Sequence, residues 1–153
     1  METNASINAT VEAILNVKGN AVWSVTPDAA VFEAIRLMAE RNVGALLVME
    51  GDRLIGIVSE RDYARKVALQ GKNSRTTPVR EILTPALHTV TPRTTLSECM
   101  ALMTDKRIRH LPVLDGGKVV GVISIGDLVN WIIRAQAAAI DQLQAYITGS
   151  YPA

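Results

Sequence analysis

Hydrophobic and polar positions follow the same order twice along the chain. Apolar residues recur at helical spacing over residues 31–39 and again over residues 96–103. Each stretch is followed by two short apolar runs with a glycine-containing, acidic turn between them, which predicts two strands joined by a tight turn. These runs cover residues 45–49 and 54–58 in the first half, and residues 111–114 and 119–123 in the second half.

Helices are predicted before and after each pair of strands. Thr26 and Thr91 each precede a proline, so we expect the first helix of each half to begin there, with the proline in its first turn. A second helix is expected from about Asp62 and from about Asp127. With a strand ahead of its first helix, each half is predicted to be β-α-β-β-α, an α/β (α+β) unit whose strands are covered by helices.

The two halves are copies of one another. At an offset of 65 residues, positions 25–64 align with positions 90–129 without a gap, and 12 of the 40 pairs are identical. A weaker match precedes each copy, because residues 11–15 resemble residues 79–83 at an offset of 68. We predict a first repeat over 11–70 with an N-terminal helical segment, a polar linker over 71–78, and a second repeat over 79–147.

The final helix departs from the repeat. In the second copy the apolar pattern continues past the expected end of the repeat, along two rows of residues: Leu128, Ile132, Ala135, Ala139, Leu143 and Ile147, then Val129, Ile133 and Ile140. An apolar face of this length requires a partner. The candidates are the N-terminal segment at residues 11–15 and a second copy of the chain.

Composition narrows the classes of function. Hydrophobic residues make up 48% and aromatic residues 4% of the 153 positions, so we expect an aliphatic core and exclude disorder. With 16 basic and 15 acidic residues, the net charge of +1 gives no electrostatic reason to expect binding to nucleic acid or membranes. The single cysteine, Cys99, fits a reducing compartment and aligns with Ala34, which favours a packing role.

Signals for export and for catalysis are also absent from the sequence. Residues 1–6 lack the pattern of a signal peptide, and the apolar runs are far shorter than the roughly 20 residues of a membrane helix, so we expect a cytoplasmic protein. The two histidines, His88 and His110, match no metal-binding spacing, and no glycine-rich loop leads into a helix. We therefore expect no enzymatic activity.

Two stretches of the sequence are typical of one family. Residues 107–115, a glycine pair and residues 121–127 closely resemble a CBS (cystathionine β-synthase) domain, and residues 42–48 with 56–62 resemble a second copy. Together they are similar to a Bateman module, the tandem CBS pair, of the small stand-alone bacterial type. The resemblance implies two repeats related by pseudo-two-fold symmetry that bind adenine nucleotides in clefts between them, and it implies a homodimer.

The resemblance assigns a ribose-binding role to one motif in each repeat. Ser59 with Asp62, and Ser124 with Asp127, match the family's Ser-x-x-Asp pattern, which contacts ribose and phosphate. A carboxylate suits a ribose diol because it accepts hydrogen bonds from both hydroxyls. The alternative is that these residues only cap the helices that follow, and the two roles can coexist.

Phosphate binding is expected to differ between the repeats. Arg109 and His110 match family positions that reach phosphates, whereas their first-copy counterparts, Gly44 and Ala45, carry no charge. Arg61 and Arg107 are further candidate cations, and for these two a solvated basic edge is an equally good interpretation. The two clefts are therefore predicted to be chemically unequal.

The remaining candidate residues would lie around the base and sugar. Thr26 and Thr91 match the family threonine beside the nucleotide, and Val43 and Ile108 match apolar residues that line the adenine slot. Trp23 could stack on a base, although a packing role is the more common one for a tryptophan.

Taken with the family resemblance, these residues predict a regulatory module that senses an adenine nucleotide. AMP is the first candidate ligand, with ADP, ATP or NAD as others, and the signal would pass through the homodimer to an unknown regulated protein. The alternative is a constitutive interaction scaffold whose nucleotide clefts are vestigial. An enzyme acting on the nucleotide is a third option, for which the sequence offers no base or nucleophile.

Overall fold

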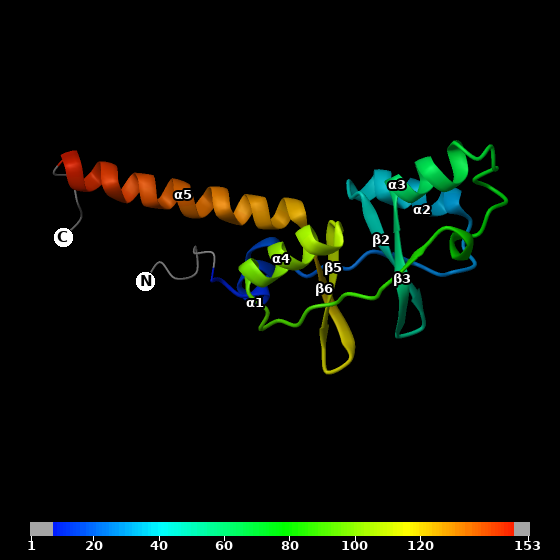
Figure 1. Cartoon of the computed structure of the whole chain (residues 1–153), viewed down its shortest axis with the longest axis horizontal. Helices are drawn as coiled ribbons and strands as arrows, with labels where there is room; N and C mark the ends of the chain where they lie inside the picture. The colour runs from blue at the N-terminus through cyan, green and yellow to red at the C-terminus, as the bar shows by residue number, and fades with distance from the viewer. Residues whose placement is uncertain (1–7, 149–153) are drawn as a thin grey trace. The chain divides into compact units, whose positions relative to one another are not determined.

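The first repeat folds with the predicted order of elements. The structure, a computed structural model, describes residues 8–148; our expectation about a signal peptide concerns residues 1–6, which lie outside the described residues. The elements of the first repeat are shown in Figure 1: β1 (Ser24–Val25), α2 (Val31–Arg41), β2 (Ala45–Glu50), β3 (Arg53–Ser59), α3 (Glu60–Tyr63) and its π-helical continuation η2 (Ala64–Ala68).

The second repeat contains the same helices and hairpin, and short segments precede both copies. Its elements are α4 (Leu96–Lys106), β5 (His110–Asp115), β6 (Lys118–Ser124) and α5 (Ile125–Thr148). The preceding segments are α1 (Val11–Lys18) and the 3-10 helix η3 (Val79–Glu81), which β4 (Thr84–Pro85) follows. The α/β class and the long C-terminal helix are confirmed. Between β4 and α4 the chain forms no strand, so the full β-α-β-β-α order holds only in the first repeat.

The predicted starts of the first helices are wrong by about four residues. The carbonyls of Thr26 and Thr91 accept hydrogen bonds from the amides three residues further on, at 3.2 and 3.1 Å, so each threonine–proline pair begins a tight turn. The helices start only after the extended residues Ala30 and Thr95. The fixed φ of proline suits the second position of a turn as well as a first helical turn, and here the turn forms.

Four strands form one mixed sheet in the order β1-β2-β3-β4. β1 is parallel to β2, while β2–β3 and β3–β4 are antiparallel. Gly56 of β3 pairs with Pro85, and the backbone of β4 passes so close that a β-carbon at position 56 would lie 2.4 Å from the Thr84 carbonyl oxygen. Only glycine fits this position without moving β4. β5 and β6 form a separate two-stranded sheet.

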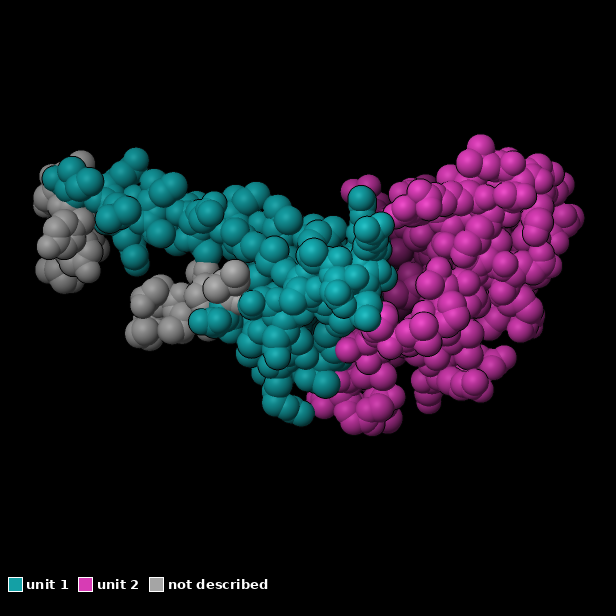
Figure 2. Space-filling view, viewed as in Figure 1, with its two compact units in different colours: residues 1–20, 90–111, 122–153 teal, residues 21–89, 112–121 magenta. Residues whose placement is uncertain are grey.

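The segments ahead of the repeats each pack on the other copy. The amide of Val11 donates to the Thr94 carbonyl at 2.7 Å, just before α4, and the amide of Val79 donates to the Ala29 carbonyl at 2.8 Å, just before α2. Two compact units result, coloured separately in Figure 2. Unit 1 contains the described parts of residues 1–20, 90–111 and 122–153, and unit 2 contains residues 21–89 and 112–121. The packing units therefore interleave along the chain, whereas the repeats follow one another in sequence.

Equivalent residues build the cores of the two units. The core of unit 2 includes the buried residues Val31, Ala34, Met38, Leu46, Val58, Val79 and Ile82. Their counterparts in unit 1 are Leu96, Cys99, Met103, Leu111, Ile123, Val11 and Ile14. Burial raises the pKa of the Cys99 thiol to about 11, and the Glu98 carboxylate adds to the effect. Cys99 is thus a packing residue, as predicted.

Only the beginning of α5 is buried against the rest of unit 1. Leu128 and Trp131 are buried there, and α1 and α4 both contact the helix. Beyond them Ile132 and Ala135 are half-buried, whereas Ile133, Ile140, Leu143 and Ile147 are exposed. Figure 1 shows the remainder of α5 extending past α1 and α4. The N-terminal segment therefore covers only the start of the predicted stripe. None of the helices within residues 8–148 is both long and apolar enough to cross a membrane.

Candidate functional site

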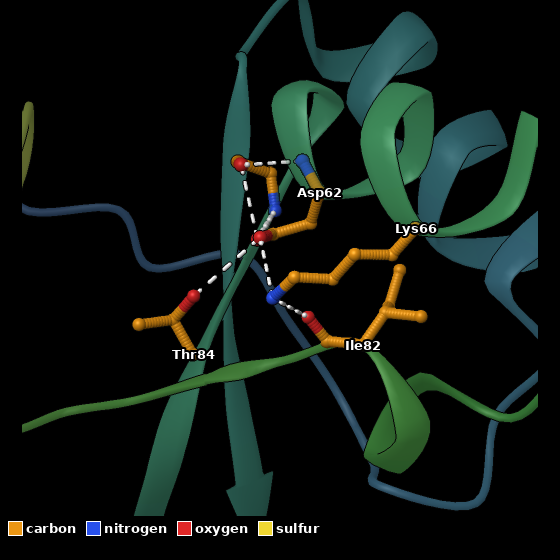
Figure 3. Close-up of polar contacts among 5 residues, drawn as sticks. Asp62, Lys66, Ile82 and Thr84 are labelled. Carbon is orange, nitrogen blue, oxygen red and sulfur yellow. Dashed lines mark hydrogen bonds and ion pairs between the residues drawn. The ribbon is translucent and has the colours of Figure 1, made fainter. Parts of the chain in front are cut away.

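Ser59 and Asp62 form a reciprocal cap at the start of α3. The helix begins at Glu60, two residues earlier than predicted, with Ser59 as its N-cap. One carboxylate oxygen of Asp62, Oδ2, accepts hydrogen bonds from the Ser59 amide and hydroxyl, both at 3.0 Å, and the Asp62 amide donates to Ser59 Oγ at 3.2 Å (Figure 3). The capping interpretation is therefore correct for this pair, and it fixes the orientation of the carboxylate.

The other carboxylate oxygen of Asp62 is also engaged. Lys66 Nζ lies 3.2 Å from Oδ1, and the Thr84 hydroxyl donates to Oδ1 at 3.4 Å. Lys66 in turn donates to the Ile82 carbonyl at 2.9 Å, as Figure 3 shows. Both oxygens of this carboxylate thus have partners, all of them within unit 2.

Ser124 and Asp127 repeat this cap in unit 1 with a different cation. Asp127 Oδ2 accepts from the Ser124 amide at 2.8 Å, and the Asp127 amide donates to Ser124 Oγ at 3.1 Å. Lys18, at the end of α1, donates to the same Oδ2 at 2.7 Å and to the Val122 carbonyl at 2.8 Å. Within residues 8–148, Oδ1 of Asp127 accepts no hydrogen bond. This carboxylate therefore keeps one oxygen available to a ligand.

His110 and Arg109 lie beside this group, at the start of β5. The Arg109 side chain is exposed, and its carbonyl accepts the Ile125 amide at 2.9 Å, which holds the residue against the beginning of α5. Burial lowers the pKa of His110, the Asp127 carboxylate opposes this shift, and Lys18 and Arg109 add to it. Burial therefore favours the neutral imidazole, and a negative charge placed beside it would favour the charged form.

In unit 2 the position that corresponds to Arg109 is Gly44, which lies beside the carboxylate of Glu60. The Gly44 carbonyl accepts the Glu60 amide at 3.0 Å, just as Arg109 accepts Ile125. A β-carbon at position 44 would lie 3.4 Å from Glu60 Oε1. A carboxylate thus lies where the second repeat presents an arginine, and it would repel a phosphate.

The structure does not join the remaining predicted residues to either aspartate. Thr26 and Thr91 are exposed in their turns, and neither hydroxyl hydrogen bonds to an aspartate within the described chain. Val43 and Ile108 are half-buried, each directly after a left-handed residue, Asn42 or Arg107, that ends the preceding helix at φ 55°.

The other two candidates, Arg61 and Trp23, lie on the surface. Arg61 is exposed at the start of α3. The guanidinium of Arg41 lies over the Trp23 ring, 4.1 Å from its centroid, so one face of the ring is already covered. In the part of the chain that the structure describes, no group of three or more His, Cys, Asp or Glu residues could hold a metal ion.

Sequence reasoning missed Lys18, Lys66 and Thr84. Lys66 follows Asp62 by four residues on a helix, a spacing that predicts an ion pair, so this contact carried a local signal. Lys18 is separated from Asp127 by 109 positions, and no local pattern links the two. The contact arises because α1 packs with the second repeat.

Comparison with known proteins identifies the fold and its family. The sequence model of the CBS domain matches residues 17–69 and 79–134. The chain belongs to the CBS domain family. It is 39% identical over 161 residues to the CBS domain-containing protein CBSX3, mitochondrial, of Arabidopsis thaliana, a match that covers 99% of this chain and 78% of that protein. The tandem CBS pair that the resemblance predicted is therefore confirmed.

Solved structures of other CBS proteins have the same fold. A CBS-domain protein of Burkholderia ambifaria MC40-6 superposes with a TM-score of 0.79 at 53% identity, over 82% of this chain and 95% of that one. The CBS domain protein PAE2072 of Pyrobaculum aerophilum, solved in complex with AMP, has a TM-score of 0.70 at 24% identity, over 82% of this chain and 98% of that one.

Proposed function

We propose that this CBS pair is a regulatory module that binds an adenine nucleotide, with its stronger contacts around Asp127. One observation carries the proposal: the Asp127 carboxylate is fixed in place by Ser124 and Lys18 through Oδ2, while Oδ1 accepts no hydrogen bond from the described residues. The side chain is 18% exposed, so a ribose hydroxyl can reach it. A preoriented acceptor with spare capacity suits a sugar diol.

The groups around Asp127 suit a phosphate. Lys18 and Arg109 are cations, and His110 can become one when a phosphate approaches. Lys18 donates to the aspartate and to a backbone carbonyl, so a bound phosphate would compete for it. Thr91 and Ile108 are the further contacts we propose for this half, beside the ribose and the base. AMP is the first candidate ligand, followed by ADP, ATP and NAD.

The motif of the first repeat is proposed to bind more weakly. Both oxygens of Asp62 already have protein partners, and Glu60 lies close to Gly44. Thr26, Val43, Ser59 and Arg61 remain its proposed contacts, with Arg61 as the exposed cation. For the first repeat alone, these observations favour the scaffold alternative, in which the nucleotide cleft is vestigial.

The proposed biological role is regulation without catalysis. CBS-domain proteins are in general regulatory, and PAE2072, which has this fold, was solved with AMP bound. We propose that the ligand shifts an equilibrium between two states of a cytoplasmic homodimer, and that the shift is transmitted to an unidentified regulated protein. A ligand can do this only through different affinities for the two states.

Thermal unfolding with AMP, ATP and NAD tests the proposal, with ribose 5-phosphate as the adenine-free control. A ligand at a hundredfold excess over its dissociation constant adds about 2.7 kcal/mol to the free energy of unfolding. Asp127→Ala and Asp62→Ala form a matched pair, because each loses one helix cap. We expect Asp127→Ala to abolish most of the rise in unfolding temperature that the ligand causes, and Asp62→Ala to retain most of that rise. No shift with any adenosine compound would favour the scaffold instead.

A further inference from the structure

Lys66 joins the carboxylate of Asp62 to the backbone of the segment that precedes β4. Its ammonium lies 3.2 Å from Asp62 Oδ1 and donates to the Ile82 carbonyl at 2.9 Å (Figure 3). Asp62 Oδ2 is already used by the cap at Ser59, so Oδ1 is the oxygen that would be left for a ligand. The lysine therefore occupies the acceptor that a ribose hydroxyl would need.

Lys66 is a stronger occupant of this oxygen than its other partner. The Thr84 hydroxyl donates to Oδ1 at 3.4 Å, which is long for a hydrogen bond between two oxygens. This hydroxyl carries no charge, and rotation about one bond turns it away. The ammonium instead holds an ion pair and a hydrogen bond to a carbonyl, and hydrogen bonds from a charged donor are roughly twice as strong as neutral ones. Access to Oδ1 is therefore controlled mainly by Lys66.

The second repeat has no lysine at the corresponding position. At the offset of 65 residues, Lys66 aligns with Trp131, which is buried in unit 1. The cation beside Asp127 is Lys18 of α1, which shares Oδ2 with the cap, so that Oδ1 accepts no hydrogen bond from the described residues. A ribose hydroxyl can thus approach Asp127 without displacing a cation, whereas at Asp62 it must displace one.

The penalty for displacing Lys66 depends on the charge of the ligand. When a neutral sugar takes the place of the ammonium at Asp62, the ion pair is lost and the sugar supplies no charge in return. A phosphate on the same sugar does supply one. The lysine side chain is 44% exposed and has a flexible stem, so its ammonium can turn from the carboxylate to the phosphate. A nucleotide thus compensates for the ion pair that it breaks, and a nucleoside does not.

We propose that Lys66 is a specificity-determining residue of the first repeat, which competes with ribose for Asp62 and is displaced only by a ligand that carries its own negative charge. The ligands of this motif are therefore phosphorylated nucleosides, and free adenosine is rejected. The inference rests on the proposed function, because it takes the motif of Ser59 and Asp62 to be a ribose site.

Titration calorimetry of the full-length chain with adenosine and with AMP tests this specificity. Asp127→Ala removes the stronger motif, so that the first repeat is measured alone. Lys66→Met is then added, because methionine keeps much of the apolar stem and has no charge. We expect Lys66→Met to strengthen adenosine binding about three- to tenfold, and to leave AMP binding unchanged or weaker. In an otherwise wild-type chain, Lys66→Met should add a second equivalent of adenosine where the wild type binds one.

Lys72→Met is the matched control for loss of a lysine. Lys72 also pairs with a carboxylate of unit 2, that of Glu81 at 3.7 Å, and its side chain is 47% exposed. It has no contact with Asp62 among the described residues. Lys72→Met should therefore change the affinity for neither ligand. Circular dichroism checks that each variant is folded.

The contact itself is tested without a nucleotide, by the rate at which an acetylating reagent modifies each lysine of the wild-type chain. Lys66 and Lys72 are almost equally exposed, so a difference in rate reports the partners that hold each ammonium. We expect Lys66 to react about threefold more slowly than Lys72. The difference should shrink in Asp62→Asn, which keeps a side-chain oxygen for the cap. Mass spectrometry of the digested chain measures both rates.

The outcomes separate this inference from the proposed function. A wild-type chain that binds no adenosine compound contradicts the proposed function, and the specificity of Lys66 with it. Adenosine binding that Lys66→Met leaves unchanged or weakens contradicts the role of Lys66 alone, and so do equal effects of Lys66→Met and Lys72→Met; nucleotide binding at Asp127 then stands. Equal acetylation of the two lysines contradicts the contact on which the inference is built.

Discussion

Asp62 and Asp127 occupy the same position of the repeat and make the same cap, yet they differ in what they can still bind. Lys66 and Thr84 engage the second oxygen of Asp62, whereas Asp127 binds its lysine through the oxygen already used for capping. The difference comes from where each cation originates: one is on the same helix and the other is on α1. Duplication thus preserved the anchor of the motif, while its surroundings diverged.

His110 gives a prediction about pH. Because burial lowers its pKa in the folded chain, the unfolded chain binds more protons near and below its ordinary pKa of about 6.5. Stability should therefore fall as the pH drops below about 6.5, by at most about 1.4 kcal/mol per pH unit from this residue. Urea unfolding of wild type and His110→Gln between pH 8 and pH 5 measures this.

The free energy of unfolding of the His110→Gln variant should depend less steeply on pH than that of the wild type. His88→Gln serves as the control for loss of a histidine. An unchanged slope in His110→Gln would contradict the burial of the neutral imidazole. AMP should restore part of the stability that the wild type loses at low pH, since a bound phosphate favours the charged form of His110.

Sequence reasoning predicted contacts only between residues that are close together in the sequence. Ser59 and Asp62 are three positions apart, and so are Ser124 and Asp127, so their contact follows from helix capping alone. Lys18 could not be predicted, because its contact depends on how segments distant in the sequence pack.

At the scale of elements, the strands were predicted more accurately than the helix starts. The predicted runs 45–49 and 119–123 lie within β2 and β6 and end within one residue of those strands, since a buried strand is marked along its whole length by apolar residues. A helix start is marked by one or two residues, and proline suits both a turn and a first helical turn. Thr26 and Thr91 therefore predicted helices where turns are found.

Gly56 supports a prediction about how β4 is held against β3. A β-carbon at this position would lie 2.4 Å from a backbone oxygen, which cannot move aside as a flexible side chain could. Gly56→Ala should lower the free energy of unfolding by about 1–3 kcal/mol, as overpacking does elsewhere. Chemical denaturation measures the change.

Gly126→Ala is the matched control. Its added β-carbon would lie 3.6 Å from the nearest atom, Ser124 Oγ, and alanine favours a helix more than glycine does. The free energy of unfolding of this variant should therefore rise by about 0.5–1 kcal/mol. Equal effects of the two substitutions would contradict the close approach of β4 to Gly56.

At the scale of the whole molecule, the two copies exchange their leading segments. The match between residues 11–15 and 79–83 showed that both copies have such a segment, and the structure packs each one beside the other copy's first helix. Sequence similarity alone could not reveal the exchange, because Val11 and Val79 would be buried equally well on either copy.

Ile14→Ala tests this exchange. Ile14 is buried in unit 1, which also contains buried Trp131, so its truncation should destabilise that unit by about 2–5 kcal/mol. In a Trp23→Phe background, Trp131 is the single tryptophan of the 153 residues and reports on unit 1 by fluorescence. The midpoint of its urea transition should fall in Ile14→Ala.

The control is Ile82→Ala, the equivalent truncation in unit 2. It should lower the midpoint of the urea transition reported by Trp131 fluorescence less than Ile14→Ala does. The reverse order would contradict the packing of α1 with the second repeat.

The place of α1 also has a consequence for the order of events during synthesis. Val11, Ile14 and Leu15 leave the ribosome well before the residues they pack with, because Leu96, in the same core, is made 81 residues after Leu15. At ordinary elongation rates that interval is on the order of ten seconds. For that time the nascent chain carries an apolar helix with no native partner, and this segment is where we expect a chaperone to bind first.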